Sequence, residues 1–406
     1  MNVVLGVSGG IAAYKACILL RLLKESGHDV TVIPTEAALK FVGEATWEAL
    51  SGRPVASGVF SDVADVKHVR LGRQADLVIV APATADLLSR AAHGRADDLL
   101  TSTLLTAACP VVFAPAMHTE MWEHAATRAN VATLRERGAH VIEPDSGRLT
   151  GADTGPGRLP EPESIVALLK AFLSPARTRR GVNTESTRDL LGRKVLVTAG
   201  GTREPIDPVR FIGNHSSGRQ GIAIAAAAAA RGADVTLIAA HIEAPLPAGI
   251  RVERVSTTIE LYDATVKAAA DADAAVLAAA PADFTPKESS DRKLKRKGDL
   301  DLALTSTPDI AAAVGRAKRE GQILVVFAAE THDGPEHAKA KREAKGAHLV
   351  VLNDVSGGAV FGSPENSVTV FDERGEVDAL AGASKESVAD AIWDAVAERL
   401  PLSGRD

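Results

Sequence analysis

Short runs of apolar residues alternate along this chain with longer stretches in which apolar positions recur every three or four residues. The first run, residues 2–7, predicts a buried strand, and residues 11–26 predict a helix that ends at Gly27. A second apolar run at 29–33 completes a β–α–β unit. The same pattern predicts further strands at 76–80, 111–114 and 140–142 and helices at 86–93, 97–107 and 120–137.

This alternation of predicted strands and helices stops at residues 174–190, where polar, basic and turn-forming residues show no apolar periodicity. It starts again after residue 190. We therefore predict a domain over 1–173, a linker over 174–190 and a second domain over 191–406. The second domain is predicted to hold an alanine-rich helix at 220–231 and strands at 194–199, 234–239, 274–280, 323–328, 348–352 and 367–371. Because strands that alternate with helices imply parallel sheets, the predicted fold class is α/β, with two doubly wound parallel-sheet domains.

Composition narrows the classes of protein that fit. With 46% hydrophobic and 24% charged residues, the chain is typical of compact soluble proteins. A net charge of −6 argues against a nucleic-acid-binding surface, and no apolar run reaches the roughly 20 residues of a membrane span. Two cysteines, Cys17 and Cys109, cannot form a disulfide framework. We therefore expect a cytoplasmic protein without a nucleic-acid or membrane partner.

The turn Ser8-Gly9-Gly10-Ile11 follows the first predicted strand and opens the first predicted helix. Glycines let the backbone approach a phosphate, and a helix start offers free N–H groups at the positive end of its dipole. The segment is neither a GxGxxG motif nor a Walker loop, so the spacing alone leaves a plain tight turn equally open.

Two segments of the second domain are rich in cations. Residues 198–221 combine turn-forming residues with Arg203, Arg210 and Arg219 and end where a helix begins. Clustered arginines without an anion are costly, which favours a binding site there. Residues 291–300 (DRKLKRKGDL) follow a predicted strand end. Such a run is commonly a solvated charged face, but a cationic loop at a strand's carboxyl end is well placed to neutralise a triphosphate.

The motifs of both halves resemble known families. APATADLLSRAAHGRADDLLT (81–101), PAMH (115–118) and GADTGPGRL (151–159) look like flavin-dependent cysteine decarboxylases. TREPIDPVRFIGNHSSGRQG (202–221), AAAPADF, KLKRK, FAAET and NDV, in this order, look like phosphopantothenate–cysteine ligases. The whole resembles the bacterial bifunctional phosphopantothenoylcysteine decarboxylase/phosphopantothenate–cysteine ligases of coenzyme A biosynthesis. The resemblance implies a flavodoxin-like FMN domain followed by a Rossmann-like ligase domain.

As the resemblance implies, the ligase half joins the carboxylate of 4′-phosphopantothenate to the amine of cysteine. The carboxylate attacks the α-phosphate of CTP, giving an acyl-cytidylate and pyrophosphate, and the amine then displaces CMP. Asn214 would contact the acyl-cytidylate, Arg210 would help to position it and Lys293 would reach the phosphates, with Mg²⁺ bound to the triphosphate. The resemblance implies the nucleotide-binding residues Leu277, Ala278, Ala279, Asp283, Lys293, Pro308, Asp309, Ile310, Ala311, Phe327, Lys341 and Lys345. No metal ligand is assigned.

The decarboxylase half would act on the product of the ligase. Loss of CO₂ from an acylated cysteine leaves a carbanion without an electron sink, and FMN supplies one by oxidising the thiol and later returning the electrons. By resemblance, His68 is catalytic, although a lone histidine is more often structural. The residues implied to hold FMN are Ser8, Gly9, Gly10, Ile11, Pro82, Ala83, Thr84, Thr101 and Ser102.

Two positions depart from the family pattern. His118 stands where members commonly have an asparagine that holds the substrate carboxylate; histidine can still donate a hydrogen bond there, so His118 is included among the catalytic residues. Gly151 stands where many members have a proton-donating cysteine. Either another group donates the proton, which we favour, or the decarboxylase stalls before the last reduction.

Two other functions stay open at this point. One is a regulatory FMN-binding flavoprotein with a ligase domain and an inactive decarboxylase, which His118 and Gly151 would suit. The other is a decarboxylase of peptide C-terminal cysteines, against which the ligase half argues. The resemblance also implies a homo-oligomer with trimeric flavin domains and dimeric ligase domains.

Overall fold

The computed structural model describes residues 1–55, 66–148, 154–173, 188–295, 300–330, 334–354 and 365–401. It divides into two compact units, one of Met1–Asp189 with Pro245–Gly249 and one of Leu190–Ala244 with Ile250–Asp406. Most of the expected linker, residues 174–187, lies outside the described residues, so the boundaries at 173 and 190 stay a prediction.

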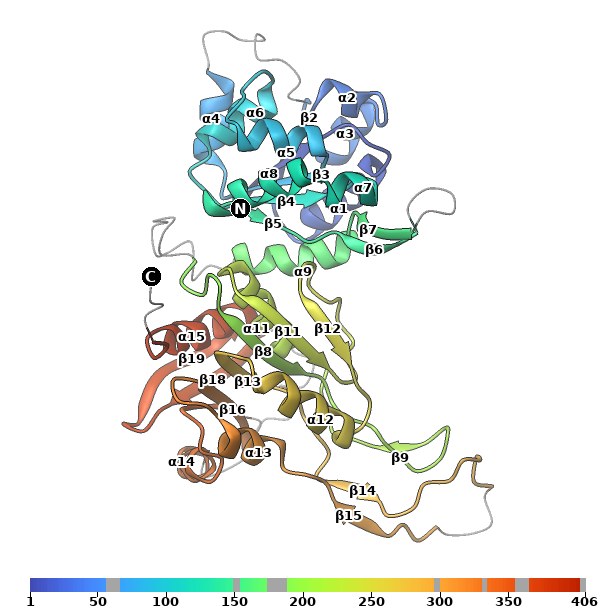
Figure 1. The fold of residues 1–406 in the computed structure, drawn as a ribbon, viewed down its shortest axis with the longest axis vertical. Helices are drawn as coiled ribbons and strands as arrows, with labels where there is room; N and C mark the ends of the chain where they lie inside the picture. The colour runs from blue at the N-terminus through green and yellow to red at the C-terminus, as the bar shows by residue number, and fades with distance from the viewer. Residues whose placement is uncertain are drawn as a thin grey trace. The chain divides into compact units, whose positions relative to one another are not determined.

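The first unit is built on a parallel sheet of five strands (Figure 1). The strands lie in the order β2 (Asp29–Pro34), β1 (Asn2–Val7), β3 (Leu77–Ala83), β4 (Val111–Pro115) and β5 (His140–Val141). This 2-1-3-4-5 order is the flavodoxin-like version of the doubly wound fold. The expected fold class is therefore confirmed for this unit, and the strand order reverses between β1 and β3.

Helices cover the two faces of this sheet. On one face α1 (Ala13–Glu25) packs against α3 (Glu44–Ser51) and α9 (Pro162–Phe172). On the other, α5 (Ala85–Ala92), α6 (Leu99–Thr106) and α8 (Ala125–Glu136) share an aliphatic core with Val78 and Val80 of β3. The smaller elements are α2 (Glu36–Leu39), α4 (Lys67–Gln74), α7 (Thr119–Glu123) and a hairpin of β6 (Asp145–Arg148) and β7 (Thr154–Arg158).

The helix predicted at 120–137 is two helices, because the chain is extended at His124 (φ −60°, ψ 137°). The His124 side chain accepts a hydrogen bond from Ala126 N and so caps α8. A side chain that bonds its own backbone competes with helix continuation, which the apolar period did not reveal.

The second unit has a mixed sheet of eight strands (Figure 1). Six parallel strands come first, in the order β12 (Arg251–Arg254), β11 (Asp234–Ala239), β8 (Lys194–Ala199), β13 (Ala274–Leu277), β16 (Ile323–Glu330) and β17 (Leu349–Asp354). The edge strands β18 (Glu365–Phe371) and β19 (Glu376–Ser384) are antiparallel. A short turn joins these two strands, and so short a connection can only join antiparallel neighbours.

Alanine makes close helix packing possible on one face of the second sheet. Here α11 (Arg219–Ala230) packs against α15 (Lys385–Ala397), and Trp393 Nε1 donates to Ile224 O at 2.8 Å. The opposite face is covered by α12 (Thr258–Ala269), α13 (Ile310–Ala317) and α14 (Gly334–Ala344), which share a core with Leu196, Val326 and Val350. The second unit is thus also doubly wound, as expected.

Two small ribbons form an arm beyond the main sheet of the second unit (Figure 1). They are β9 (Glu204–Pro205) paired with β10 (Phe211–Ile212), and β14 (Phe284–Pro286) paired with β15 (Leu304–Ser306). The arm exposes the large apolar side chains Val209, Phe211, Phe284, Leu300 and Leu304. Among the helices of the described residues, none has both the length and the apolar character needed to cross a bilayer.

Candidate functional sites

In the first unit, Ser8 joins the ends of the two central strands. Its buried hydroxyl donates to Pro82 O at 2.7 Å and accepts from Thr84 N at 3.0 Å. Thr84 in turn caps α5 by accepting from Leu87 N. The structure therefore brings Ser8 together with Pro82, Ala83 and Thr84, at the carboxyl ends of β1 and β3 where doubly wound folds bind ligands.

The two glycines of the first turn have different roles. A Cβ on Gly9 would lie 2.4 Å from Ala37 Cβ, so packing against α2 explains this glycine. A Cβ on Gly10 would meet no protein atom closer than 3.7 Å. The following helix, α1, has no side-chain cap at Ala12. Its first N–H groups therefore suit a phosphate, and beside them Ile11 is 75% exposed.

His118 lies at the carboxyl end of the next strand. Ala116 N donates to Ala83 O, which links the end of β4 to the end of β3. His118 is exposed, and its carbonyl accepts from Met121 N and Trp122 N at the start of α7. The structure thus places His118 on the same sheet edge as the Ser8 turn.

His68 lies on α4, which the apolar pattern did not predict. The helix packs closely on α6, since a Cβ on Gly72 would approach Thr106 Oγ1 to 2.3 Å, and Thr106 Oγ1 donates to His68 O. Thr101 and Ser102 are buried near the start of α6, where Thr101 Oγ1 donates to Asp98 Oδ1 in a capping box. The Thr101 hydroxyl is therefore engaged with its own helix.

The hairpin β6–β7 lies against the segment that carries His118. Met117 N donates to Gly157 O at 2.9 Å, and a Cβ on Gly157 would lie 2.2 Å from Met117 O. A Cβ on Gly155 would lie 2.4 Å from Thr119 Oγ1, a buried atom that has no hydrogen-bond partner among the residues that the structure describes. The apolar pattern missed this hairpin, although its glycine-rich motif was noted. Gly151 lies outside the described residues.

The second unit contains a pocket of about 400 Å³ near the carboxyl ends of β13, β16 and β17. It includes the start of α11, which has no side-chain cap at Gly218. Asn214 lines it, and its Nδ2 donates to Pro281 O at 2.8 Å. The other predicted residues that line this pocket are Ala278, Ala279, Asp283, Phe327 and Lys341.

Arg210 and Lys293 belong to a second group outside this lining. Arg210 Nη2 donates to Asp207 Oδ2 at 2.6 Å and to Leu294 O at 2.7 Å. Leu294 N donates to the same Asp207 oxygen, and Lys293 is exposed beside it. Asp207 thereby ties the arginine segment to the cationic loop, and sequence reasoning did not single it out.

Lys345 lies just beyond the end of α14, where it forms an ion pair with Asp309. Asp309 also caps α13 by accepting from Ala312 N. Partial burial opposes ionisation of Asp309, but the hydrogen bonds from Lys345 and Ala312 N outweigh it and lower its pKa. Leu277 and Ile310 are buried, and Pro308, Asp309, Ile310, Ala311, Leu277 and Lys345 do not line the pocket.

The pocket also holds polar residues that sequence reasoning missed, Gln220, Asn366 and Lys385. Asn353, in the NDV motif already noted, lines it as well. Within the described part of the chain, the Oδ1 atoms of Asn353 and Asn366 are buried without a hydrogen-bond partner. Asn366 lies on β18 and Lys385 on α15, both far along the chain from Asn214. No local sequence motif identifies them as pocket residues.

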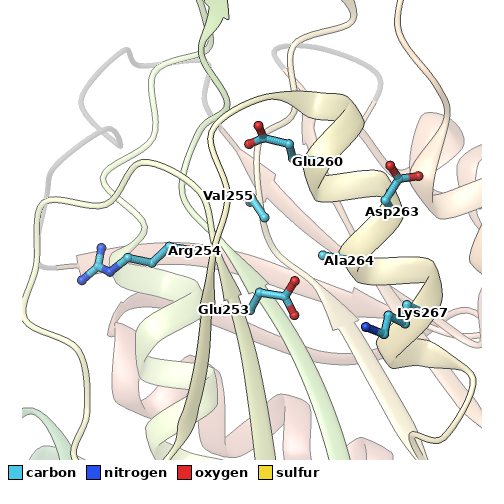
Figure 2. A pocket seen from close by; sticks show the side chains of 7 residues that line it. All are labelled: Glu253, Arg254, Val255, Glu260, Asp263, Ala264 and Lys267. Atoms are coloured by element: carbon cyan, nitrogen blue, oxygen red, sulfur yellow. The ribbon is translucent and has the colours of Figure 1, made fainter.

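A further hollow of about 390 Å³ lies between the end of β12 and α12 (Figure 2). Figure 2 shows Glu253 and Lys267 on its two sides and Arg254 pointing away. The Glu260 carboxylate accepts from Ser256 N and Thr257 N and so caps α12. Within the described residues, no group of three or more histidine, cysteine or acidic side chains is arranged to hold a metal ion. The acidic residues of this hollow therefore do not form a metal site.

Known proteins match this chain along nearly its whole length. The family described as Flavoprotein matches residues 1–174, and the family described as DNA/pantothenate metabolism flavoprotein C-terminal domain matches residues 190–400. The coenzyme A biosynthesis bifunctional protein CoaBC of Mycobacterium tuberculosis is 55% identical over 407 residues, which cover 97% of this chain and 96% of that protein. The protein of the same name from Vibrio cholerae is 39% identical over 405 residues, 98% of each chain. A crystal structure of the C-terminal domain of a CoaBC protein covers 52% of this chain and 97% of its own, at 33% identity and a TM-score of 0.45.

Proposed function

Because this chain belongs to the family of bifunctional coenzyme A biosynthesis proteins, a ligase and flavoprotein decarboxylase in one polypeptide, we propose the following roles for its residues. The second unit ligates cysteine to 4′-phosphopantothenate with CTP and Mg²⁺, and the first unit decarboxylates the product with FMN. The comparisons give no support to a purely regulatory flavoprotein. A cytoplasmic location and domain limits near 173 and 190 belong to the same proposal.

The pocket at the start of α11 carries the ligase proposal. It joins an uncapped helix start, which suits phosphates, to Phe327, whose ring offers an apolar surface to the base or ribose. Asn214, held by Pro281 O, would contact the acyl-cytidylate, and Lys341 would meet the phosphates. The ion pair between Lys345 and Asp309 supports this side of the pocket through α13 and α14.

Activation of the carboxylate requires several anions to be held together. Asp207 binds Arg210 and the backbone N–H of Leu294, the neighbour of Lys293, so it holds the segments that supply these two positive groups. They would position the carboxylate against the α-phosphate, whose bond to the β-phosphate breaks as the new oxygen–phosphorus bond forms. Mg²⁺ would be held mainly by the phosphates themselves, as is common for this ion.

In the first unit, the residues present fit the phosphate of FMN. The evidence is the uncapped start of α1 and the open space at Gly10, beside the Ser8 hydroxyl and the Pro82–Thr84 segment. When bound, FMN would supply a reversible two-electron acceptor for the cysteine thiol. His68 would exchange a proton with the reacting thiol or carboxylate, and His118 would hold the substrate carboxylate.

A product analysis of the purified full-length chain tests this proposal. We expect a yellow protein that converts 4′-phosphopantothenate, cysteine and CTP to 4′-phosphopantetheine, CO₂, CMP and pyrophosphate. His68→Asn should lower CO₂ release by about 10²-fold or more while CMP release continues. Asn214→Asp should block CMP release while supplied acyl-cysteine is still decarboxylated.

Two other outcomes would contradict this proposal. Accumulation of the acyl-cysteine without CO₂ would contradict the decarboxylase and revive the regulatory alternative. Equal loss of both activities in His68→Asn would show that His68 is structural.

A further inference from the structure

The pocket at the start of α11, here called the α11 pocket, is also lined by residues to which the proposed ligase assigns no role. Lys385, the first residue of α15, is only 8% exposed and yet lines the pocket. Its carbonyl accepts from Gln220 Nε2 at 3.2 Å, and Gln220 Oε1 accepts from Asn366 Nδ2 at 3.3 Å. The Gln220 amide therefore holds the start of α15 and strand β18 beside the start of α11.

The side chain of Lys385 lacks a matching charge. Among the described residues, no hydrogen bond or ion pair is formed by the Lys385 ammonium. A buried cation without a partner is costly, so a protein retains one where something else supplies the negative charge. This isolation is the first indication of a ligand.

The surroundings of Lys385 also favour an anion. Burial lowers the pKa of its ammonium, the positive Arg219 at the start of α11 lowers it further, and Glu386 opposes the shift. No side chain of Gly218 caps the start of α11, which lines the same pocket, and the positive end of a helix dipole favours an anion. Two cations, Lys385 and Arg219, and the start of α11 therefore line one pocket.

We propose that Lys385 binds the terminal phosphates of the nucleotide substrate, an inference that rests on the proposed ligase function. When the substrate carboxylate bonds to the α-phosphate, the bond from that phosphorus to the bridging oxygen breaks. The oxygen keeps the electron pair and leaves as part of pyrophosphate. Lys385 neutralises the charge that this leaving group gains.

The location of Lys385 favours the nucleotide over 4′-phosphopantothenate as the source of this phosphate. Lys385 shares its pocket with Phe327 and Lys341, whereas Arg210 and Lys293 lie in the separate group tied by Asp207. Pyrophosphate is the probe that isolates the proposed contact, because it contains the terminal phosphates and nothing else of either substrate.

The test uses the full-length chain and calorimetric titration with inorganic pyrophosphate and Mg²⁺. Lys385→Met should weaken pyrophosphate binding by about 10- to 100-fold, the value of a charge-assisted contact. Lys385→Arg should restore much of the loss. Without ligand, Lys385→Met should also raise the Tm by about 2 °C or more, because it removes an unpaired buried charge.

Lys267→Met is the matched control, since it removes one positive charge from the hollow of Figure 2 in the same unit. It should leave pyrophosphate binding unchanged. In steady-state kinetics, Lys385→Met should raise the KM for CTP and leave the KM for 4′-phosphopantothenate near the wild-type value.

Other results overturn either the inference or the ligase function on which it rests. Unchanged pyrophosphate affinity together with a lower Tm would make Lys385 structural, and a selective rise in the KM for 4′-phosphopantothenate would assign it to the other substrate. If the wild-type chain binds pyrophosphate through Lys385 but forms no CMP, the anion subsite stands and the proposed ligase fails.

Discussion

At the scale of single residues, Asp207 connects two segments that the proposed ligation requires. Its buried carboxylate accepts from Val209 N, Arg210 N, Arg210 Nη2 and Leu294 N. Burial alone would disfavour the charge, but these hydrogen bonds outweigh it and lower the pKa of Asp207 from 3.8 to about 2. The carboxylate is therefore stabilised by the folded loop that it organises.

Asp207→Asn should lower both the Tm and the rate of CMP formation. Because the pKa is depressed in the folded chain, the stabilising contribution of Asp207 is present above its unfolded pKa and is lost as the pH falls from about 4 to about 2. The Tm difference between wild type and Asp207→Asn should therefore be largest above pH 4 and shrink below it. If the Tm difference does not change with pH, ionisation of Asp207 is not the cause of the stabilisation.

Single residues also show how far the sequence could predict the site. The resemblance assigned both Lys341 and Lys345 to the nucleotide site, but only Lys341 lines the pocket, whereas Lys345 pairs with Asp309. Asp207 and Lys385 were missed. Their positions depend on contacts with Leu294 and Gln220, which are distant in sequence, and no local period encodes such contacts.

At the scale of elements, the hairpin β6–β7 depends on glycines that leave no room for a side chain. Gly157 has φ +140°, and its Cα faces Met117 O so closely that a Cβ would overlap it. The bond from Met117 N to Gly157 O then fixes the hairpin over the segment that ends at His118.

Gly157→Ala should push the hairpin away from Met117 and raise the KM of the decarboxylation step by at least about fivefold. Gly138→Ala is the control, since Gly138 also has a positive φ of 92° in the same unit but open space at its Cβ. CO₂ release at varied acyl-cysteine concentration measures the effect. Equal behaviour of the two variants would show that backbone strain, and not the contact with Met117, is responsible.

Elements differ in how well the sequence predicts them. The central strands β1, β8 and β11 were predicted with the bounds that the structure has, because a strand buried on both faces is a continuous apolar run. The short ribbons β9–β10 and β14–β15 were missed. Each has two or three residues per strand, and pairing across the arm, not periodicity, defines them.

At the scale of the whole molecule, the exposed arm of the second unit bears on assembly. Val209, Phe211, Phe284, Leu300 and Leu304 give it a concentration of apolar surface that a monomer rarely leaves in water. The expected dimer of ligase domains stays a prediction, and this surface is where we expect the second copy to bind.

Phe284→Ser combined with Leu304→Ser should therefore lower the oligomeric mass of the full-length chain in light scattering after size-exclusion chromatography. Ile259→Ser is the matched control, because Ile259 is similarly exposed but lies on α12 and not on the arm. If all these proteins have the same mass, the arm does not hold copies together.

The residues that line the α11 pocket are spread along the chain from Asn214 to Lys385. After residues 198–221 have been synthesised, the ribosome must still add more than a hundred and fifty amino acids before β18 and α15 are complete. Only then can these two elements form their part of the pocket. All five strands of the first unit's sheet come from residues 2–141, which are made much earlier. The sheet of the first unit can thus form while the pocket of the second unit is still incomplete.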